Sequence, residues 1–134
     1  MDDRRDQVVA LAVVVDARRV LLARRAVAEG SLAWVFPGGK AEPGETAEDA
    51  AVREAREEVG VVVEAARVLG ERIHPDTDRR VVYVACRLVS GTAAPISARE
   101  VSEAVWAGSG MLGELIPTGL FGPAQEYLAG ALDE

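Results

Sequence analysis

The 134-residue chain contains no asparagine, one cysteine, one histidine and one lysine. Because Cys86 is the only cysteine, an intramolecular disulfide and a cysteine-based metal cluster are both excluded, and its apolar surroundings predict a buried strand residue. No apolar run is long enough to cross a bilayer, and the charged N-terminus lacks the apolar core of a signal peptide. We therefore expect a cytoplasmic protein with no membrane partner.

The overall charge and composition narrow the function further. The formal net charge of −7 argues against a polyanionic partner, so we expect no nucleic acid to bind. Hydrophobic residues make up 49% of the chain and charged residues 28%, which are globular values. The length predicts a single domain over residues 1–134, with enough chain to bury a core, as a monomer or a homodimer.

An acidic helix is predicted between Thr46, a good N-cap residue, and Gly60, which is placed to end the helix. It carries an E-x-x-E-E pattern formed by Glu54, Glu57 and Glu58. Residues three and four apart share one helix face, so these carboxylates are directed at one region. Such all-oxygen clusters suit Mg²⁺ or Mn²⁺ better than Zn²⁺. The alternative interpretation is an acidic helix face that is simply solvated.

The residues around this pattern favour a metal-binding cluster over a solvated helix face. The segment resembles the Nudix box, G-x5-E-x7-R-E-U-x-E-E-x-G-U, where U is aliphatic. The fixed positions are matched by Gly39, Glu45, Arg53, Glu54, Glu57, Glu58, Gly60 and Val61. Ala55 occupies the first aliphatic position, and the preceding Trp34-Val35-Phe36-Pro37-Gly38 also looks typical of the family. The sequence is therefore similar to the Nudix hydrolases, in particular to MutT-like members.

This resemblance implies an α+β fold, the Nudix-type α/β/α sandwich with a mixed sheet between helices. It implies Mg²⁺-dependent hydrolysis, with Mn²⁺ as a possible substitute, of the diphosphate linkage in a nucleoside diphosphate derivative. The implied metal ligands in the box are the Gly39 carbonyl, Glu54, Glu57 and Glu58. Arg53 would orient Glu57, and Glu45 would fix the loop before the helix. The proton acceptor stays open among Glu57, Glu58 and Glu100.

Three further sets of charged residues are candidate site residues, one inside the box and two outside it. Arg24 and Arg25 end a predicted strand and either are solvated or bind phosphate, with Arg25 the better match to a phosphate-contacting arginine of MutT-type proteins. Lys40, the only lysine, lies inside the box and is a candidate substrate-binding residue. Many family members recruit a further carboxylate from a later loop, and we expect Glu100 before Glu103 in that role, unless both are solvated.

The predicted substrate is a nucleoside triphosphate, which would be cleaved to the monophosphate and pyrophosphate. Members that act on oxidised guanine read the base with an asparagine, which this chain lacks, so a broad or different triphosphate specificity is expected. The alternative is an ADP-ribose or nucleotide-sugar pyrophosphatase, since Pro75 lies at about the distance past the box where those enzymes often carry proline. An alternative of another class is a non-catalytic, nucleotide-binding regulatory Nudix domain, although such domains usually have a degraded box.

Hydrophobic patterning and turn residues place the remaining elements. We expect strands at 7–15, 20–23, 34–36, 61–63, 65–73, 80–88 and 100–106, with helices at 111–116 and 123–132. The strand material at 61–63 and 65–73 is expected to be irregular or bent. We expect loops at 27–33 and 90–97 and a turn at 74–78. His74, in that turn, is either a surface residue or a residue that borders the substrate pocket.

Overall fold

The structure is a computed structural model, which describes residues 7–29, 32–75, 77–97 and 99–132. In this part of the chain, seven strands form one mixed sheet, in which β4 pairs with β1 and β7 pairs with β2 beside the path β3-β2-β1-β6-β5. The strands are β1 (Val8–Asp16), β2 (Arg19–Glu29), β3 (Leu32–Val35), β4 (Gly38–Lys40), β5 (Val62–Ile73), β6 (Arg80–Ser90) and β7 (Val101–Ala107). The helices are α1 (Ala47–Val59), α2 (Ser109–Leu115) and α3 (Gly122–Ala131).

The centre of the sheet is the parallel pair β1 and β6. Ala10 lies opposite Val82 and Val14 lies opposite Cys86, and all four side chains are buried. A strand covered on both faces needs apolar residues at consecutive positions, which is the pattern that predicted both strands. Cys86 is a buried strand residue, as expected, and burial raises the pKa of its thiol to about 12.

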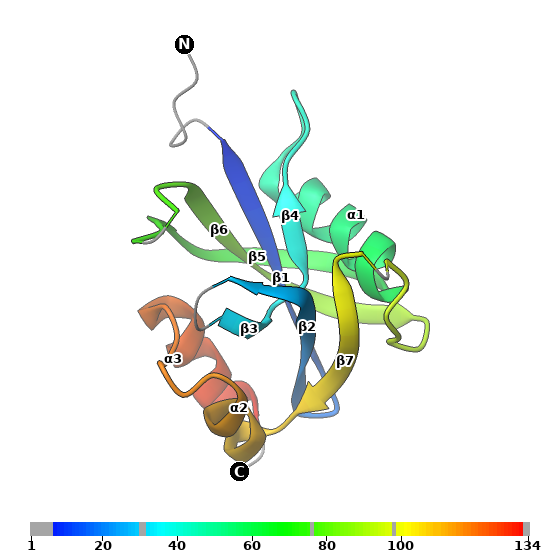
Figure 1. The fold of residues 1–134 in the computed structure, drawn as a ribbon, viewed down its shortest axis with the longest axis vertical. Helices are drawn as coiled ribbons and strands as arrows, with labels where there is room; N and C mark the ends of the chain where they lie inside the picture. The colour runs from blue at the N-terminus through cyan, green and yellow to red at the C-terminus, as the bar shows by residue number, and fades with distance from the viewer. Residues whose placement is uncertain (1–6, 30–31, 76, 98, 133–134) are drawn as a thin grey trace.

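Helices cover both faces of the sheet, with α1 on one side and α2 and α3 on the other (Figure 1). Ala51, Ala55 and Val59 of α1 belong to one buried cluster with β1, β5 and β6. Ala124 and Leu128 of α3 belong to a second cluster on the opposite face. The predicted α/β/α sandwich is therefore confirmed, with two apolar layers that bury the two faces of one sheet.

The helix that carries the acidic pattern begins and ends where its capping residues predict. The Thr46 side chain accepts a hydrogen bond of 3.1 Å from the Asp49 amide. Gly60 adopts a left-handed conformation, with φ of 74°, and its amide donates to the Arg56 carbonyl. Because this conformation is strained for other residues, Gly60 fixes the end of α1 immediately after the Glu57-Glu58 pair.

The loop prediction for residues 27–33 is wrong in part. Strand β2 continues to Glu29 and β3 begins at Leu32, since β2 pairs with β3 on one edge and with β7 on the other. Hydrogen bonds to two neighbours extend β2 beyond the short apolar run that predicted it. In contrast, the irregular strand expected over 61–63 and 65–73 is confirmed by three register shifts between β5 and β6, one at Val62/Val63 and two between Ala65 and Gly70. Among the described residues, no helix is long and apolar enough to span a membrane.

Candidate active site

Three carboxylates converge beside the end of α1. Glu54, Glu58 and Glu100 each offer an oxygen that lies within 4.8 Å of the oxygens of the other two. Glu54 and Glu58 come from successive turns of α1, and Glu100 directly precedes β7. The Ala26 amide donates a hydrogen bond of 2.9 Å to the Glu100 carbonyl, so the β2–β7 pairing holds Glu100 in place.

Glu58 is the most deeply placed of these acids, with only 6% of its surface exposed. Burial raises the pKa of the Glu58 carboxyl to about 8, and the nearby Glu54 and Glu100 carboxylates act in the same direction. A 3.3 Å hydrogen bond from the Gly38 amide opposes this shift by favouring the ionised form. An acid buried among like charges gains stability from a cation, so the environment of Glu58 suits a metal site.

The backbone next to these acids requires glycine for steric reasons. A Cβ atom at Gly39 would lie 2.7 Å from the Glu54 carboxyl carbon, and one at Gly38 would lie 2.2 Å from the Ala10 carbonyl oxygen. Both separations are below contact distance. At Gly38 the obstacle is backbone, so a side chain would displace the strand, whereas at Gly39 the obstacle is the end of the Glu54 side chain, which would have to move away from the carboxylate cluster. The Gly38-Gly39 backbone can therefore lie directly against the carboxylate cluster, as the role predicted for the Gly39 carbonyl requires.

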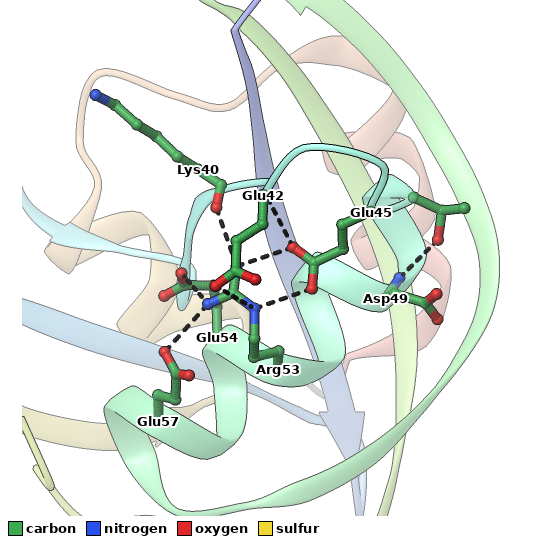
Figure 2. A network of polar contacts seen from close by, with 8 residues as sticks. Lys40, Glu42, Glu45, Asp49, Arg53, Glu54 and Glu57 are labelled. Carbon is green, nitrogen blue, oxygen red and sulfur yellow. Dashed lines mark hydrogen bonds and ion pairs between the residues drawn. The ribbon is translucent and has the colours of Figure 1, made fainter.

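Arg53 connects the loop before α1 to the acidic face of the helix (Figure 2). Its guanidinium donates to both oxygens of Glu45, each at 2.9 Å, and to the Lys40 carbonyl at 3.0 Å. Its Nη1 atom also donates to Glu54 at 2.9 Å and to Glu57 at 3.1 Å. One arginine therefore positions a loop and two carboxylates, which extends its predicted role beyond orienting Glu57.

Contacts in this network shift the pKa values of Glu45, Arg53 and Glu54. Hydrogen bonds from the Arg53 guanidinium and from the Glu42 amide lower the pKa of Glu45 to about 2. The Glu45 carboxylate in turn raises the pKa of Arg53. The pKa of Glu54 is raised by burial, although Arg53 opposes that shift. Glu45 is thus a fixed negative charge that orders the loop, as predicted, whereas Glu54 faces the cleft.

Glu57 lies apart from the three converging acids. Its side chain is 58% exposed and contacts Arg53, and it is not a member of the group formed by Glu54, Glu58 and Glu100. Its role as a metal ligand or proton acceptor stays a prediction. The structure does separate the two later acids, because Glu100 joins the cluster whereas Glu103 forms an ion pair of 3.2 Å with Arg24.

The same strand pair distinguishes the two candidate arginines. A register shift falls between Arg24 and Arg25, and such a bulge redirects neighbouring side chains. Arg25 lines a cleft next to the acids, whereas Arg24 lies outside the cleft lining, half exposed on Glu103. Lys40 and His74 also line this cleft.

The cleft has a volume of about 700 Å³ and two chemically different regions. One region carries Gly38, Gly39 and the three converging acids, and the other carries apolar and aromatic side chains. The second region includes Arg72, Tyr83 and Phe121, which sequence reasoning missed. Their common feature is long-range packing between β5, β6 and the start of α3, for which no local pattern gives a signal.

The donor set fits a divalent cation. Three carboxylates with oxygens within 4.8 Å of one another, beside a glycine backbone, provide the oxygen ligands that Mg²⁺ and Mn²⁺ prefer. The buried position of Glu58 supports the same fit, because an ion there would neutralise charge that otherwise faces a low-dielectric environment.

Comparisons with known proteins define the class to which this fold and site belong. The family model of the NUDIX domain matches residues 4–120, and the chain therefore belongs to the Nudix family. Among solved structures, a Nudix hydrolase from Nitrosomonas europaea superposes with a TM-score of 0.76 at 22% identity, covering 92% of this chain and 70% of that chain. A MutT Nudix hydrolase from Burkholderia pseudomallei superposes with a TM-score of 0.67 at 24% identity, covering 95% and 98%. At these identities the likeness establishes the fold.

Two curated relatives share shorter segments. An 8-oxo-dGTP diphosphatase from Proteus vulgaris is 44% identical over 48 residues, which are 36% of this chain and 43% of that protein. An ADP-ribose pyrophosphatase from Methanocaldococcus jannaschii is 38% identical over 74 residues, which are 52% of this chain and 44% of that protein. The matched segments thus span less than half the length of each relative. The family prediction is confirmed, and divalent metal use is general in this family.

Proposed function

We propose that this protein hydrolyses the diphosphate linkage of nucleoside diphosphate derivatives with Mg²⁺, and that its substrates are nucleoside triphosphates. The observation that carries this proposal is the convergence of Glu54, Glu58 and Glu100 at the wall of a large cleft. In the proposed reaction, water adds across one P–O–P bridge. One P–O bond forms, one breaks, and the products are a nucleoside monophosphate and pyrophosphate.

The acids would hold the metal, with the Gly39 carbonyl beside them. When bound, a divalent cation neutralises phosphate charge and makes a water molecule more acidic. Arg53 keeps Glu54 and the preceding loop in one geometry, and metal sites depend on such outer contacts. Mn²⁺ would substitute for Mg²⁺, because the same hard oxygen ligands suit both ions. Glu57, Glu58 and Glu100 are the candidates for accepting the proton from water.

Cationic side chains would bind the phosphates that the metal does not neutralise. Arg25 and Lys40 line the cleft, and a guanidinium matches phosphate oxygens with two parallel hydrogen bonds. Arg24 contributes less in this proposal, because Glu103 already occupies its Nη1 atom. The cleft therefore places cationic side chains next to acids that a bound metal would neutralise, so a phosphate would meet positive charge there although the protein's net charge is −7.

A second candidate function is hydrolysis of ADP-ribose or a nucleotide sugar. The specific support is the archaeal relative named as an ADP-ribose pyrophosphatase, whose match covers more of this chain than that of the bacterial 8-oxo-dGTP diphosphatase. A cleft of about 700 Å³ is large enough for either kind of nucleotide. Non-catalytic nucleotide binding is the third possibility and is tested by the same experiment.

The test is a panel of nucleoside triphosphates, ADP-ribose, nucleotide sugars and dinucleotide polyphosphates, assayed with Mg²⁺, with Mn²⁺ and with a chelator. The proposal expects metal-dependent release of pyrophosphate and nucleoside monophosphate from triphosphates. Faster turnover of ADP-ribose or a nucleotide sugar would replace the first candidate by the second. Metal-dependent nucleotide binding without turnover of any compound would identify a regulatory binding domain and overturn both enzymatic candidates.

A further inference from the structure

Arg72 lines the cleft, and its guanidinium packs against two aromatic rings. It lies near the end of β5, paired with Val81 of β6, and its Nη2 atom donates a hydrogen bond of 3.2 Å to the Tyr83 hydroxyl. The guanidinium carbon lies 5.2 Å from the ring centre of Phe121 and 5.9 Å from that of Tyr83. The two rings stack on each other with their centres 4.8 Å apart. These contacts fix the plane of the guanidinium.

The donors of Arg72 are not fully used. Its Nε atom is buried without a hydrogen-bond partner, and within the described residues no carboxylate forms an ion pair with it. A buried donor without a partner is costly, and in native proteins it calls for a reason. Arg72 lines the cleft, so a ligand that enters the aromatic region can accept hydrogen bonds from its terminal Nη atoms, whereas the enclosed Nε would be reached only after a small movement of the side chain.

We propose that Arg72 determines base specificity, by donating two hydrogen bonds to the O6 and N7 edge of a guanine-type purine in preference to adenine. This inference rests on the proposed function and names the substrate class of the same cleft. A guanidinium only donates, and its parallel N–H groups match two adjacent acceptors. Adenine presents an amino donor beside N7, so one donor of Arg72 and the amino group would face each other unpaired.

A base fits this region better than a phosphate does. Phe36, Tyr83, Ile116 and Phe121 supply apolar and aromatic lining, which suits a flat heterocycle, and His74, Thr77 and Arg79 add polar groups from the β5–β6 turn. Stacking on aromatic side chains stabilises a base of any identity, so discrimination has to come from a polar group in the same region. Phe121, which is only partly buried, could meet the base, and the same ring together with the buried Tyr83 holds Arg72, so the parallel N–H donors of Arg72 are oriented before the nucleotide binds.

The test compares α,β-methylene analogues of GTP and ATP, which resist cleavage, in calorimetric titrations with Mg²⁺ present. Wild-type protein is expected to bind the guanine analogue roughly 10- to 100-fold more tightly. Arg72→Gln is expected to lose that preference and to favour adenine, because glutamine can pair with adenine N6 and N7. The kcat/KM ratio for GTP over ATP should change in parallel.

Arg67→Gln is the matched control. Its guanidinium also lies over an aromatic ring, 5.5 Å from the centre of Tyr127, but Arg67 is exposed and is absent from the cleft lining. The ratio of guanine to adenine affinity should be unchanged in Arg67→Gln. Arg72→Lys keeps the positive charge but loses the two parallel N–H donors. This variant should stay folded and show a smaller ratio of guanine to adenine affinity.

Several outcomes would overturn the inference. Equal wild-type affinity for the two analogues would do so directly, even if the protein hydrolyses triphosphates, and this result does not depend on any variant folding. A uniform loss of affinity for both bases in the Arg72 variants would assign Arg72 to phosphate binding or to packing. Failure of the proposed function looks different, because neither analogue would bind and no triphosphate would be turned over.

Discussion

Arg53 and Glu45 form a two-point ion pair, in which Nε lies 2.9 Å from one carboxylate oxygen and Nη2 lies 2.9 Å from the other. The pair joins the loop before α1 to the middle of the helix, and the remaining donor of Arg53 reaches Glu54 and Glu57. The geometry of the acidic face is therefore linked to that loop and to the end of β4, where the Lys40 carbonyl accepts a hydrogen bond from the same guanidinium.

Replacing Arg53 by lysine should reduce both kcat and the affinity for Mg²⁺ by about 10- to 100-fold, because an ammonium cannot make the parallel bonds to Glu45 and still reach Glu54. Kinetics at several Mg²⁺ concentrations would separate the two effects. Arg56→Lys on the exposed side of α1 serves as the control and should behave like wild type. Normal metal dependence in Arg53→Lys would refute the positioning role.

Glu57→Gln and Glu58→Gln should each lower kcat by about two orders of magnitude or more, as expected when a charge that positions a metal or activates water is removed. Steady-state rates on the best triphosphate substrate provide the measurement. Glu48→Gln, an exposed acid in the first turn of α1, should change kcat little. Rates near the wild-type value in both variants would show that neither acid positions a metal or activates water.

Glu100→Gln should reduce kcat more than Glu103→Gln. Glu100 shares a cluster with Glu54 and Glu58, whereas Glu103 pairs with Arg24 at a half-exposed position. An exposed ion pair contributes little to stability, so Glu103→Gln should also fold normally. The two variants are compared under identical metal and substrate concentrations, and the opposite ranking would transfer the additional carboxylate role to Glu103.

The metal-free protein should lose stability as the pH rises from about 4.5 to about 8. The pKa of Glu58 is about 4.5 in the unfolded chain and about 8 in the folded protein, so over this interval the folded state binds the extra proton. The free energy of unfolding then falls with increasing pH, on the order of 1.4 kcal/mol for each pH unit. Thermal melts in a chelator at pH 5, 6.5 and 8 would measure the slope.

The Glu58→Gln variant should show a flatter dependence of stability on pH. Mg²⁺ added to the wild-type protein should restore its stability at pH 8. Glu45 acts in the opposite direction, because its pKa is lowered to about 2 in the folded state. Its contribution is present above pH 4.5 and is lost as the pH falls toward 2. Melting temperatures that rise between pH 5 and pH 8 in the chelator would contradict the assigned environment of Glu58.

The sequence alone predicted the features that depend on local structure. Thr46 and Gly60 set the ends of α1 through capping, and the spacing of Glu54 and Glu58 placed them on one face. The approach of Glu100 followed only from family resemblance, because it depends on the pairing of β2 with β7, whose strands are far apart in the sequence. The same pairing, together with β3, extended β2 into residues predicted as a loop.

Arg72 shows the limit of sequence reasoning most clearly. It belongs to an irregular strand and has no motif around it, so nothing local distinguishes it from other arginines of the chain. Its position becomes meaningful only when β6 supplies Tyr83 and the start of α3 supplies Phe121. Contacts between a cation and aromatic rings of distant segments produce no periodic pattern in the sequence. Carboxylates spaced along one helix do produce such a pattern.

The most direct test of this account is a Mn²⁺ titration of wild-type protein and of Glu58→Gln, followed by electron paramagnetic resonance of the free ion. We predict saturable binding to the wild type and at least a tenfold weaker affinity in Glu58→Gln, with Glu48→Gln unchanged. Identical binding curves for wild type and Glu58→Gln, or no saturable binding to either, would contradict the claim that the converging acids of α1 hold a divalent cation.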